Sequence, residues 1–206
     1  CSLWPHATLR SSLRSTSRYA AGAVVNGRSA PHLRDDVPQP ARVWWRKVAL
    51  PKLRPEQAEA LAAWTKEGCR GQVIMPTGTG KTEVALAAMA QTRVATLVVA
   101  PIRDLMYQWH RRILAAFDYD AGIVGDNLFD IKPVTVTTYY SAYIHMDKMG
   151  AGFGLLIFDE EHHLPGNCRR EAAILSAATM RLGLTATPER SDGLHADLDW
   201  LIGPVV

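Results

Sequence analysis

Short apolar runs alternate with stretches of helical periodicity from about residue 50 onward. Residues 94–100 and 155–158 are apolar throughout, which is typical of strands buried on both faces of a parallel sheet. Residues 103–117 repeat apolar side chains at helical spacing, with Arg111 and Arg112 off that face, so they predict an amphipathic helix packed on the sheet. The alternation predicts an α/β domain with a mostly parallel central sheet and helices on both faces.

The same pattern predicts the remaining elements. Pro55 near the start and Gly68 at the end bound an expected first helix. The other expected elements are strands at 72–74, 123–124, 134–138 and 181–184 and helices at 83–90 and 139–146.

Residues 1–48 show no sustained period, and we expect a disordered or loosely structured basic segment followed by one domain over 49–206. The segment has a net charge of +6, whereas the remainder has −3. A basic tail is compatible with nucleic-acid binding, for which tail charge alone is weak evidence. Its Arg- and Ser-rich composition up to Arg34 also resembles an organelle transit peptide, which stays an alternative. Residues 43–46 fit a short strand or a hydrophobic anchor.

Composition argues against a membrane protein, a disulfide-bonded protein and a zinc protein. The chain is 48% hydrophobic, and no window approaches the roughly 18 consecutive apolar residues of a membrane span, so we expect no membrane partner. The three cysteines are widely spaced and form no Cys-x-x-Cys pair. This spacing favours a reducing compartment without a disulfide framework or a zinc site.

A glycine turn between the strand at 72–74 and the following helix is the strongest chemical signal. Its backbone N–H groups and the helix dipole would cradle a polyphosphate such as that of ATP. Lys81 would reach the β- and γ-phosphates, and the Thr82 hydroxyl would take one position on a phosphate-bound Mg²⁺. Met75 stands where the general pattern has glycine, and a chance glycine turn is the alternative. The expected nucleotide-binding residues of the loop are Pro76, Thr77, Gly78, Thr79, Gly80, Lys81 and Thr82.

Acidic side chains follow the apolar strand at 155–158 directly. Asp159 would hold Mg²⁺, largely through water, and Glu160 would accept a proton from the attacking water in nucleotide hydrolysis. Two other interpretations remain: a transition-metal site that uses His162 and His163, and a solvated charge cluster.

Two further pairs are ambiguous from spacing alone. Arg54 and Gln57 fit an exposed helix N-terminus better than an adenine-reading pair, although Gln can bond the Hoogsteen edge of adenine and Arg can stack on its ring. Thr185 and Thr187 follow a short strand and fit a turn or cap, or a bridge from the acidic pair to a mobile part.

Several motifs follow one another between about residues 50 and 206. They are Leu-Arg-Pro-x-Gln, Pro-Thr-Gly-x-Gly-Lys-Thr, a Pro-x-x-x-Leu-x-x-Gln-Trp segment ending at Trp109, Val-Thr-Thr-Tyr at 136–139, Asp-Glu-x-His and Thr-Ala-Thr-Pro. Their order resembles the first RecA-like domain, a P-loop NTPase fold, of superfamily 2 helicases. The segments Asp-Glu-Glu-His-His-Leu-Pro, 182–193 and Leu-Ile-Gly-Pro-Val-Val at 201–206 are similar to the XPB branch. The resemblance covers about residues 50–206.

The resemblance implies an ATP-dependent DNA helicase or translocase, working in the nucleoid or nucleus. It makes Arg54 and Gln57 the adenine-reading pair and implies that Lys81, Asp159 and Glu160 act in catalysis. It also implies coupling of nucleotide state to movement by His162, Thr185 and Thr187, and sequence-tolerant contacts to the nucleic-acid backbone by Ile102, Arg103, Thr137 and Thr138.

Family members place ATP between two RecA-like domains, and the second supplies arginine fingers. We find no second domain in these residues, so we expect this chain to bind ATP·Mg²⁺ but to hydrolyse it slowly. Partners in repair, transcription or restriction all fit. Two other functions stay open: the translocase of a restriction system, and a nucleotide-dependent DNA-binding module that never catalyses.

Overall fold

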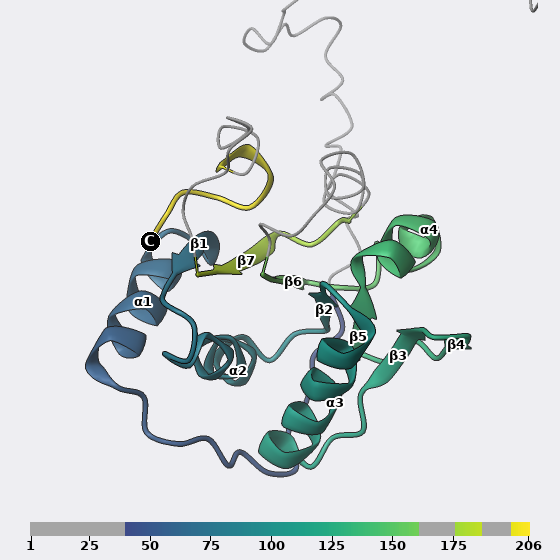
Figure 1. Ribbon diagram of the computed structural model, residues 1–206, viewed down its shortest axis with the longest axis horizontal. Coiled ribbons are helices and arrows are strands. Elements are labelled where there is room, and N and C mark those ends of the chain that lie inside the picture. Colours follow the sequence, from purple (N-terminus) through teal and green to yellow (C-terminus); the bar gives the residue numbers. More distant parts are fainter. Residues whose placement is uncertain (1–39, 161–175, 187–198) are drawn as a thin grey trace, which may run out of the picture. The chain divides into compact units, whose positions relative to one another are not determined.

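The computed structural model describes residues 40–160, 176–186 and 199–206. Within these residues, seven strands form one sheet in the order β1-β7-β6-β2-β5-β3-β4 (Figure 1). The elements are α1 (Pro55–Lys66), β1 (Arg70–Ile74), α2 (Lys81–Thr92), β2 (Thr96–Ala100), α3 (Arg103–Phe117), β3 (Gly122–Gly125), β4 (Leu128–Phe129), β5 (Val134–Thr138), α4 (Tyr139–Met149), β6 (Leu155–Asp159) and β7 (Met180–Thr185).

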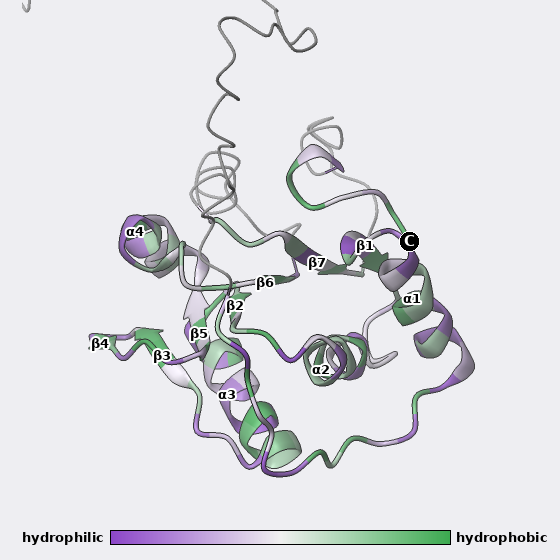
Figure 2. Cartoon of the chain, turned by 180° about the vertical axis from the view of Figure 1, so that it is seen from behind, coloured by the Kyte–Doolittle hydropathy of each residue, from purple (hydrophilic) through white to green (hydrophobic). Residues whose placement is uncertain are grey.

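All strand pairs of the sheet are parallel except β3 with β4, which confirms the predicted α/β class. Apart from Thr96 and Asp159 at their ends, the strands β2 and β6 are apolar, as Figure 2 shows for the middle of the sheet. Both are buried between helices, and this is why their sequences do not alternate. Their carboxyl ends lie at the same edge of the sheet as that of β1.

Helices cover both faces of the sheet, as predicted. Figure 1 shows α1, α2 and α3 on one face and α4 on the other. Two separate apolar clusters correspond to these faces. Val98 and Ile157 belong to the cluster with the side chains of α2 and α3, whereas Val99 and Phe158 belong to the cluster with those of α4. Neighbouring strand residues thus fill opposite cores.

Residues 40–48 are packed against this unit, although the sequence assigns them to the N-terminal segment. Val43 is buried, and its backbone N–H donates to the carbonyl of Arg93 at 2.9 Å. The Trp45 ring stacks on Phe117 with 4.1 Å between ring centroids. These side chains act as the hydrophobic anchor that the sequence offered as one interpretation, so the packed part of the chain begins before residue 49.

The hairpin of β3 and β4 has no counterpart among the predicted elements beyond the short run at 123–124. Asp126 and Asn127 both have positive φ, at 52° and 62°. A two-residue turn with positive φ at both positions suits the right-handed twist of a hairpin, and Asp and Asn tolerate this conformation better than most residues. The hairpin therefore extends the sheet beyond β5.

The free edge of β1 is covered by the last residues of the chain. The Gln72 N–H donates to the carbonyl of Pro204 at 2.8 Å, and the Val206 N–H donates to the carbonyl of Gln72 at 2.9 Å. The Gln72 side chain also donates to Asp199 and Gly203. These bonds satisfy backbone groups at an edge that would otherwise be open.

Across the ranges that the structure describes, no helix combines the length and the apolar character needed to cross a bilayer.

Replacing Gly122 with Ala tests how closely residues 130–132 pack against β3. An added Cβ would overlap the Asp130 carbonyl oxygen and lie 2.9 Å from the Lys132 amide nitrogen. We expect the free energy of unfolding to fall by about 1–3 kcal/mol, the usual cost of overpacking. Urea denaturation measures it, with Gly152→Ala as the control, because the nearest atom there is 3.6 Å away. Equal stability of the two variants would contradict the packing described.

Candidate nucleotide-binding site

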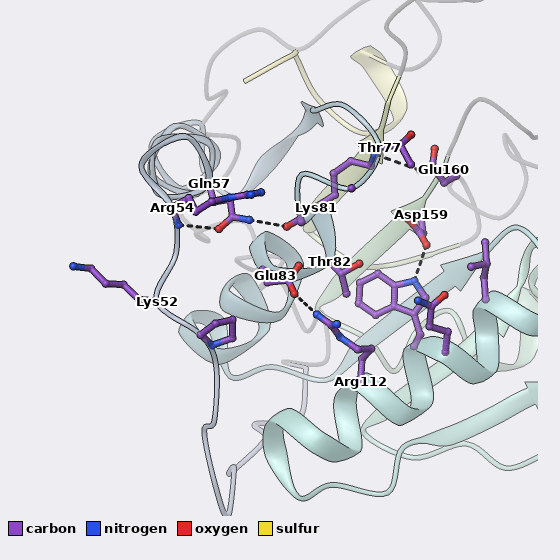
Figure 3. A pocket seen from close by; sticks show the side chains of 16 residues that line it. Lys52, Arg54, Gln57, Thr77, Lys81, Thr82, Glu83, Arg112, Asp159 and Glu160 are labelled. Atoms are coloured by element: carbon purple, nitrogen blue, oxygen red, sulfur yellow. Dashed lines mark hydrogen bonds and ion pairs between the residues drawn. The ribbon is translucent and has the colours of Figure 1, made fainter.

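A pocket of about 610 Å³ opens where β1 and β6 end, between the start of α1, the start of α2 and one face of α3 (Figure 3). It brings together residues that lie up to about 100 positions apart in the chain. Its lining residues are Pro51, Lys52, Arg54, Gln57, Thr77, Gly78, Gly80, Lys81, Thr82, Glu83, Leu105, Gln108, Trp109, Arg112, Asp159 and Glu160.

The loop between β1 and α2 has the backbone that the sequence predicts for a phosphate cradle. Gly78 and Gly80 have φ of 79° and 81°, and Gly80 is the N-cap of α2. A Cβ at Gly80 would overlap the side-chain amide of Gln57. The positive φ therefore favours glycine at this position, and a larger residue would also displace the Gln57 side chain. The first turn of α2 lines the pocket, so the positive end of its helix dipole lies there.

The Lys81 side chain is held inside the pocket. It is 8% exposed, and its Nζ donates to the Met75 carbonyl at 3.0 Å and lies 3.4 Å from Oε1 of Glu160. Met75 contributes backbone atoms to the loop, because its carbonyl accepts from Lys81 and its N–H donates to the carbonyl of Thr185. The methionine that replaces the usual glycine is thus compatible with the loop.

Asp159 is fixed by two hydrogen bonds from different elements. Its Oδ2 accepts from the indole Nε1 of Trp109 at 2.7 Å, and its backbone carbonyl accepts from the Tyr139 hydroxyl at 3.0 Å. Burial raises the pKa of the Asp159 carboxyl above its usual value, and the neighbouring Glu160 charge acts in the same direction. The indole hydrogen bond and the Lys81 ammonium lower that pKa and so favour the carboxylate form.

Glu160 follows β6 with a φ of 48°, in the left-handed region. This conformation costs a non-glycine residue on the order of 1–3 kcal/mol and is concentrated at functional sites. It directs the carboxylate toward Lys81, as Figure 3 shows. Asp159 and Glu160 therefore lie at the pocket together, where the sequence predicts them.

Arg54 and Gln57 contact the phosphate loop. Gln57 is 4% exposed, and its Nε2 donates to the Thr79 carbonyl at 2.9 Å and to the Gly80 carbonyl at 3.3 Å. Its Oε1 accepts from the backbone N–H of Arg54, whose guanidinium also donates to the Thr79 carbonyl. The exposed helix terminus favoured from spacing is therefore wrong for Gln57, because tertiary contact with the loop buries it. Adenine reading by this pair stays a prediction.

Several pocket residues were given no role from the sequence, and three of them make contacts that help to build the site. Trp109 belongs to a motif used for the resemblance, but nothing in that motif reveals its bond to Asp159. Glu83 and Arg112 form an ion pair that joins the first turn of α2 to α3 (Figure 3). No local signal could have found this pair, since it depends on how two helices lie side by side.

The donor set fits a Mg²⁺-nucleotide better than a metal held by protein alone. Among the described residues, no group of three or more His, Cys, Asp and Glu side chains could hold a metal ion. Mg²⁺ is usually bound by one or two carboxylates together with substrate phosphates. Thr82 and Asp159 line the same pocket and could supply the hydroxyl and the carboxylate. The alternative site with His162 and His163 lies outside the described residues.

The candidate nucleic-acid residues lie at the carboxyl ends of β2 and β5. Ile102 is exposed, and the exposed Arg103 guanidinium pairs with Asp126 at 2.9 Å. Thr138 caps α4 by accepting from the Ser141 N–H. Thr137 differs from the expectation: its side chain is fully buried, and its hydroxyl donates to the Val124 carbonyl. It is buried because β5 is packed on both faces, so its side chain is not available to a strand of nucleic acid.

Of the three candidate coupling residues, the structure describes one. Thr185 is buried at the end of β7, and its carbonyl accepts from Met75 at the start of the phosphate loop at 3.0 Å. His162 and Thr187 lie outside the described residues. The described part of this motif is therefore joined directly to the start of the nucleotide loop by a hydrogen bond.

Comparison with known proteins identifies the family. Residues 50–190 match the family model described as "Type III restriction enzyme, res subunit". The DNA 3'-5' translocase XPB2 of Sulfurisphaera tokodaii is 50% identical over 155 residues, which cover 75% of this chain and 35% of the relative. The DNA 3'-5' helicase XPB of Kineococcus radiotolerans is 37% identical over 163 residues, covering 74% and 29%. The chain thus spans about a third of these relatives' length.

A solved structure with lower sequence identity supports the fold. The Sulfolobus solfataricus SWI2/SNF2 ATPase core in complex with dsDNA superposes with a TM-score of 0.64 at 17% identity, over 79% of this chain and 38% of that one. This likeness extends the RecA-like assignment to the tertiary structure. With its phosphate loop, its acidic pair and these relatives, the chain belongs to the superfamily 2 helicase family of the restriction-enzyme res subunit, and within it to the XPB-like branch as a first RecA-like domain.

Proposed function

We propose that this chain binds ATP with Mg²⁺ in the pocket at the ends of β1 and β6 and serves as the ATPase domain of a DNA helicase or translocase. The observation that supports this most directly is the meeting of Lys81, Asp159 and Glu160 at one glycine loop. Neither a structural salt bridge nor a simple turn explains two partly buried acidic groups and a buried ammonium around an open pocket.

The residues divide the work as follows. The backbone N–H groups of the loop after Pro76 and the Lys81 ammonium bind and orient the phosphates. The Thr82 hydroxyl and the Asp159 carboxylate would hold Mg²⁺, which neutralises charge on the β- and γ-phosphates when bound. Glu160 accepts the proton of the attacking water. For this, the Glu160 carboxylate must exchange its contact with Lys81 for the water once phosphate takes the ammonium.

Adenine recognition is assigned to the start of α1. Gln57 fixes the loop through its amide, and the Arg54 guanidinium is half exposed beside it. A planar guanidinium on the pocket wall suits stacking on a base. We therefore assign Arg54 to stacking and Gln57 to a combined role in reading the base edge and holding the loop.

Nucleic-acid contact is assigned to the ends of β2 and β5, through Ile102, Arg103 and the backbone and hydroxyl of Thr138. These contacts would be to phosphates and sugars, so binding is expected to tolerate sequence changes and to weaken with salt. The Arg103 guanidinium is paired with Asp126 of the hairpin turn. The direction 3′ to 5′ appears in the names of both relatives and is the direction we propose here.

The whole protein's partners follow from the relatives. A second RecA-like domain that supplies arginine would complete the site, and repair or transcription factors fit an XPB-like motor. The family model's description keeps the restriction translocase as a second candidate. The XPB names of relatives at 50% and 37% identity favour the first.

Lys81→Ala tests the phosphate site. The variant loses a charge-assisted contact, so we expect ATP to bind about 10- to 100-fold more weakly, in line with the worth of hydrogen bonds to charged groups. Titration with a fluorescent ATP analogue measures it. Lys52→Ala is the control, because the Lys52 side chain points away from the other pocket residues in Figure 3. Similar losses in both variants would mean that the pocket binds nucleotide by bulk charge only.

Glu160→Gln separates the enzyme from a binding module that never hydrolyses. The amide keeps the shape but cannot accept the proton, so we expect single-turnover hydrolysis to slow by about 10²- to 10⁴-fold while ATP affinity stays within a few-fold. Release of labelled phosphate gives the rate. Hydrolysis at the wild-type rate would remove Glu160 from the mechanism.

Arg103→Ala tests the nucleic-acid face. If its guanidinium neutralises one phosphate, the plot of log affinity against log salt should lose about one unit of slope, with little change in sequence preference. Fluorescence anisotropy with labelled DNA measures this. Arg111→Ala on the same helix is the matched control, because Arg111 is exposed and is not among the residues assigned to the nucleic-acid face. An unchanged slope for Arg103→Ala would exclude the contact.

A further inference from the structure

The Asp159 residue is held by two aromatic side chains to which neither the sequence nor the proposed mechanism gives a role. Trp109 comes from the middle of α3 and Tyr139 from the first position of α4. One bonds the carboxylate, and the other bonds the backbone carbonyl of the same residue. Side chain and main chain of Asp159 are therefore fixed by different helices.

The Trp109 bond holds one oxygen of the Asp159 carboxylate. The indole is buried, and its Nε1 lies 2.7 Å from Oδ2 of Asp159. An indole N–H is a donor only and cannot bind a cation. It therefore holds the carboxylate without competing for a cation, in the pocket that Thr82 and Lys81 also line. Partners of this kind orient metal-binding carboxylates and raise metal affinity.

The Tyr139 bond fixes the position of the main chain at the end of β6. Tyr139 is buried, its ring stacks on Phe158 with 6.0 Å between centroids and 2° between planes, and its hydroxyl lies 3.0 Å from the Asp159 carbonyl. The ring and the hydroxyl contact consecutive residues at the end of β6. Movement of the start of α4 would therefore move the main chain of Asp159.

Both helices begin at the positions assigned to nucleic acid. Helix α3 starts at Arg103, six residues before Trp109, which corresponds to about 9 Å along a rigid helix. Tyr139 follows Thr138 directly. Each candidate backbone contact is thus joined to Asp159 by one element and one hydrogen bond.

We propose that Trp109 and Tyr139 are positioning residues that hold the Mg²⁺-binding carboxylate of Asp159 and connect it to the nucleic-acid face at the ends of β2 and β5. The inference rests on the proposed function. It adds a connection through α3 and α4 to the one expected through Thr185, and it requires no contact of either ring with nucleotide or nucleic acid.

Trp109→Phe tests the hold on the carboxylate, because it keeps the aromatic ring and removes the N–H. Affinity for a slowly hydrolysed ATP analogue is measured with Mg²⁺ and again with EDTA. We expect the gain in affinity from Mg²⁺ to fall by about 10- to 100-fold, the usual effect of losing such a partner, while binding in EDTA is unchanged. A purely structural role would alter both affinities or neither.

Trp64→Phe is the matched control. Trp64 is fully buried, and its Nε1 donates to the Arg181 carbonyl at 2.8 Å, away from the pocket. This variant loses the same kind of hydrogen bond, so we expect lower thermal stability and a wild-type response to Mg²⁺.

Tyr139→Phe tests the connection to nucleic acid. The affinity of labelled DNA is measured with and without the Mg²⁺-bound analogue, and the ratio of the two gives the coupling between the sites. We expect the ratio to move toward one in Tyr139→Phe and to stay at the wild-type value in Tyr140→Phe, which removes an exposed hydroxyl on the next residue.

The outcomes separate the two proposals. If the wild-type chain binds the analogue without any gain from Mg²⁺, the proposed function fails and this inference fails with it. If the wild type shows the gain and Trp109→Phe retains it in full, or Tyr139→Phe retains the wild-type coupling ratio, the function stands and the inference is overturned.

Discussion

The parallel pairing of β1, β7 and β6 is the constraint on which the site depends. Ile74 pairs with Thr185, and Asp159 pairs with Leu184, so the three strands end within one residue of each other. The phosphate loop and the acidic pair follow directly from these ends. A parallel sheet gathers its carboxyl ends at one edge, and this edge is where open α/β sheets bind ligands.

Charge balance at that edge explains why so many polar groups are buried together. Burial raises the pKa of Asp159, and Glu160 adds a second negative charge beside it. The Lys81 ammonium, the indole N–H of Trp109 and the positive end of α2 offset these effects. The arrangement places the Lys81 ammonium beside the Asp159 and Glu160 carboxylates at the pocket, which is a suitable environment for a phosphate chain with its cation.

Much of the fold could be predicted because its local signals are strong. The predicted bounds of α3 and β5 agree with the structure at both ends, since Pro101 and the capping Thr138 mark the boundaries. The hairpin strand β4 was missed because two residues are too few for a period. The packing of Val43 was missed because only its contacts with distant residues distinguish it from a polar tail.

The sequence by itself determined the chemistry of the phosphate loop, the succession of strands and helices along the chain, and the family. All three depend on residue type and local spacing. The tertiary structure decided which side chains are available to a ligand and which are held by other parts of the chain. It buried Gln57 against the loop, buried Thr137 inside the sheet and placed Trp109 on Asp159. Each of these depends on neighbours that are 13 to 50 residues away in the chain, and no local pattern records such distances.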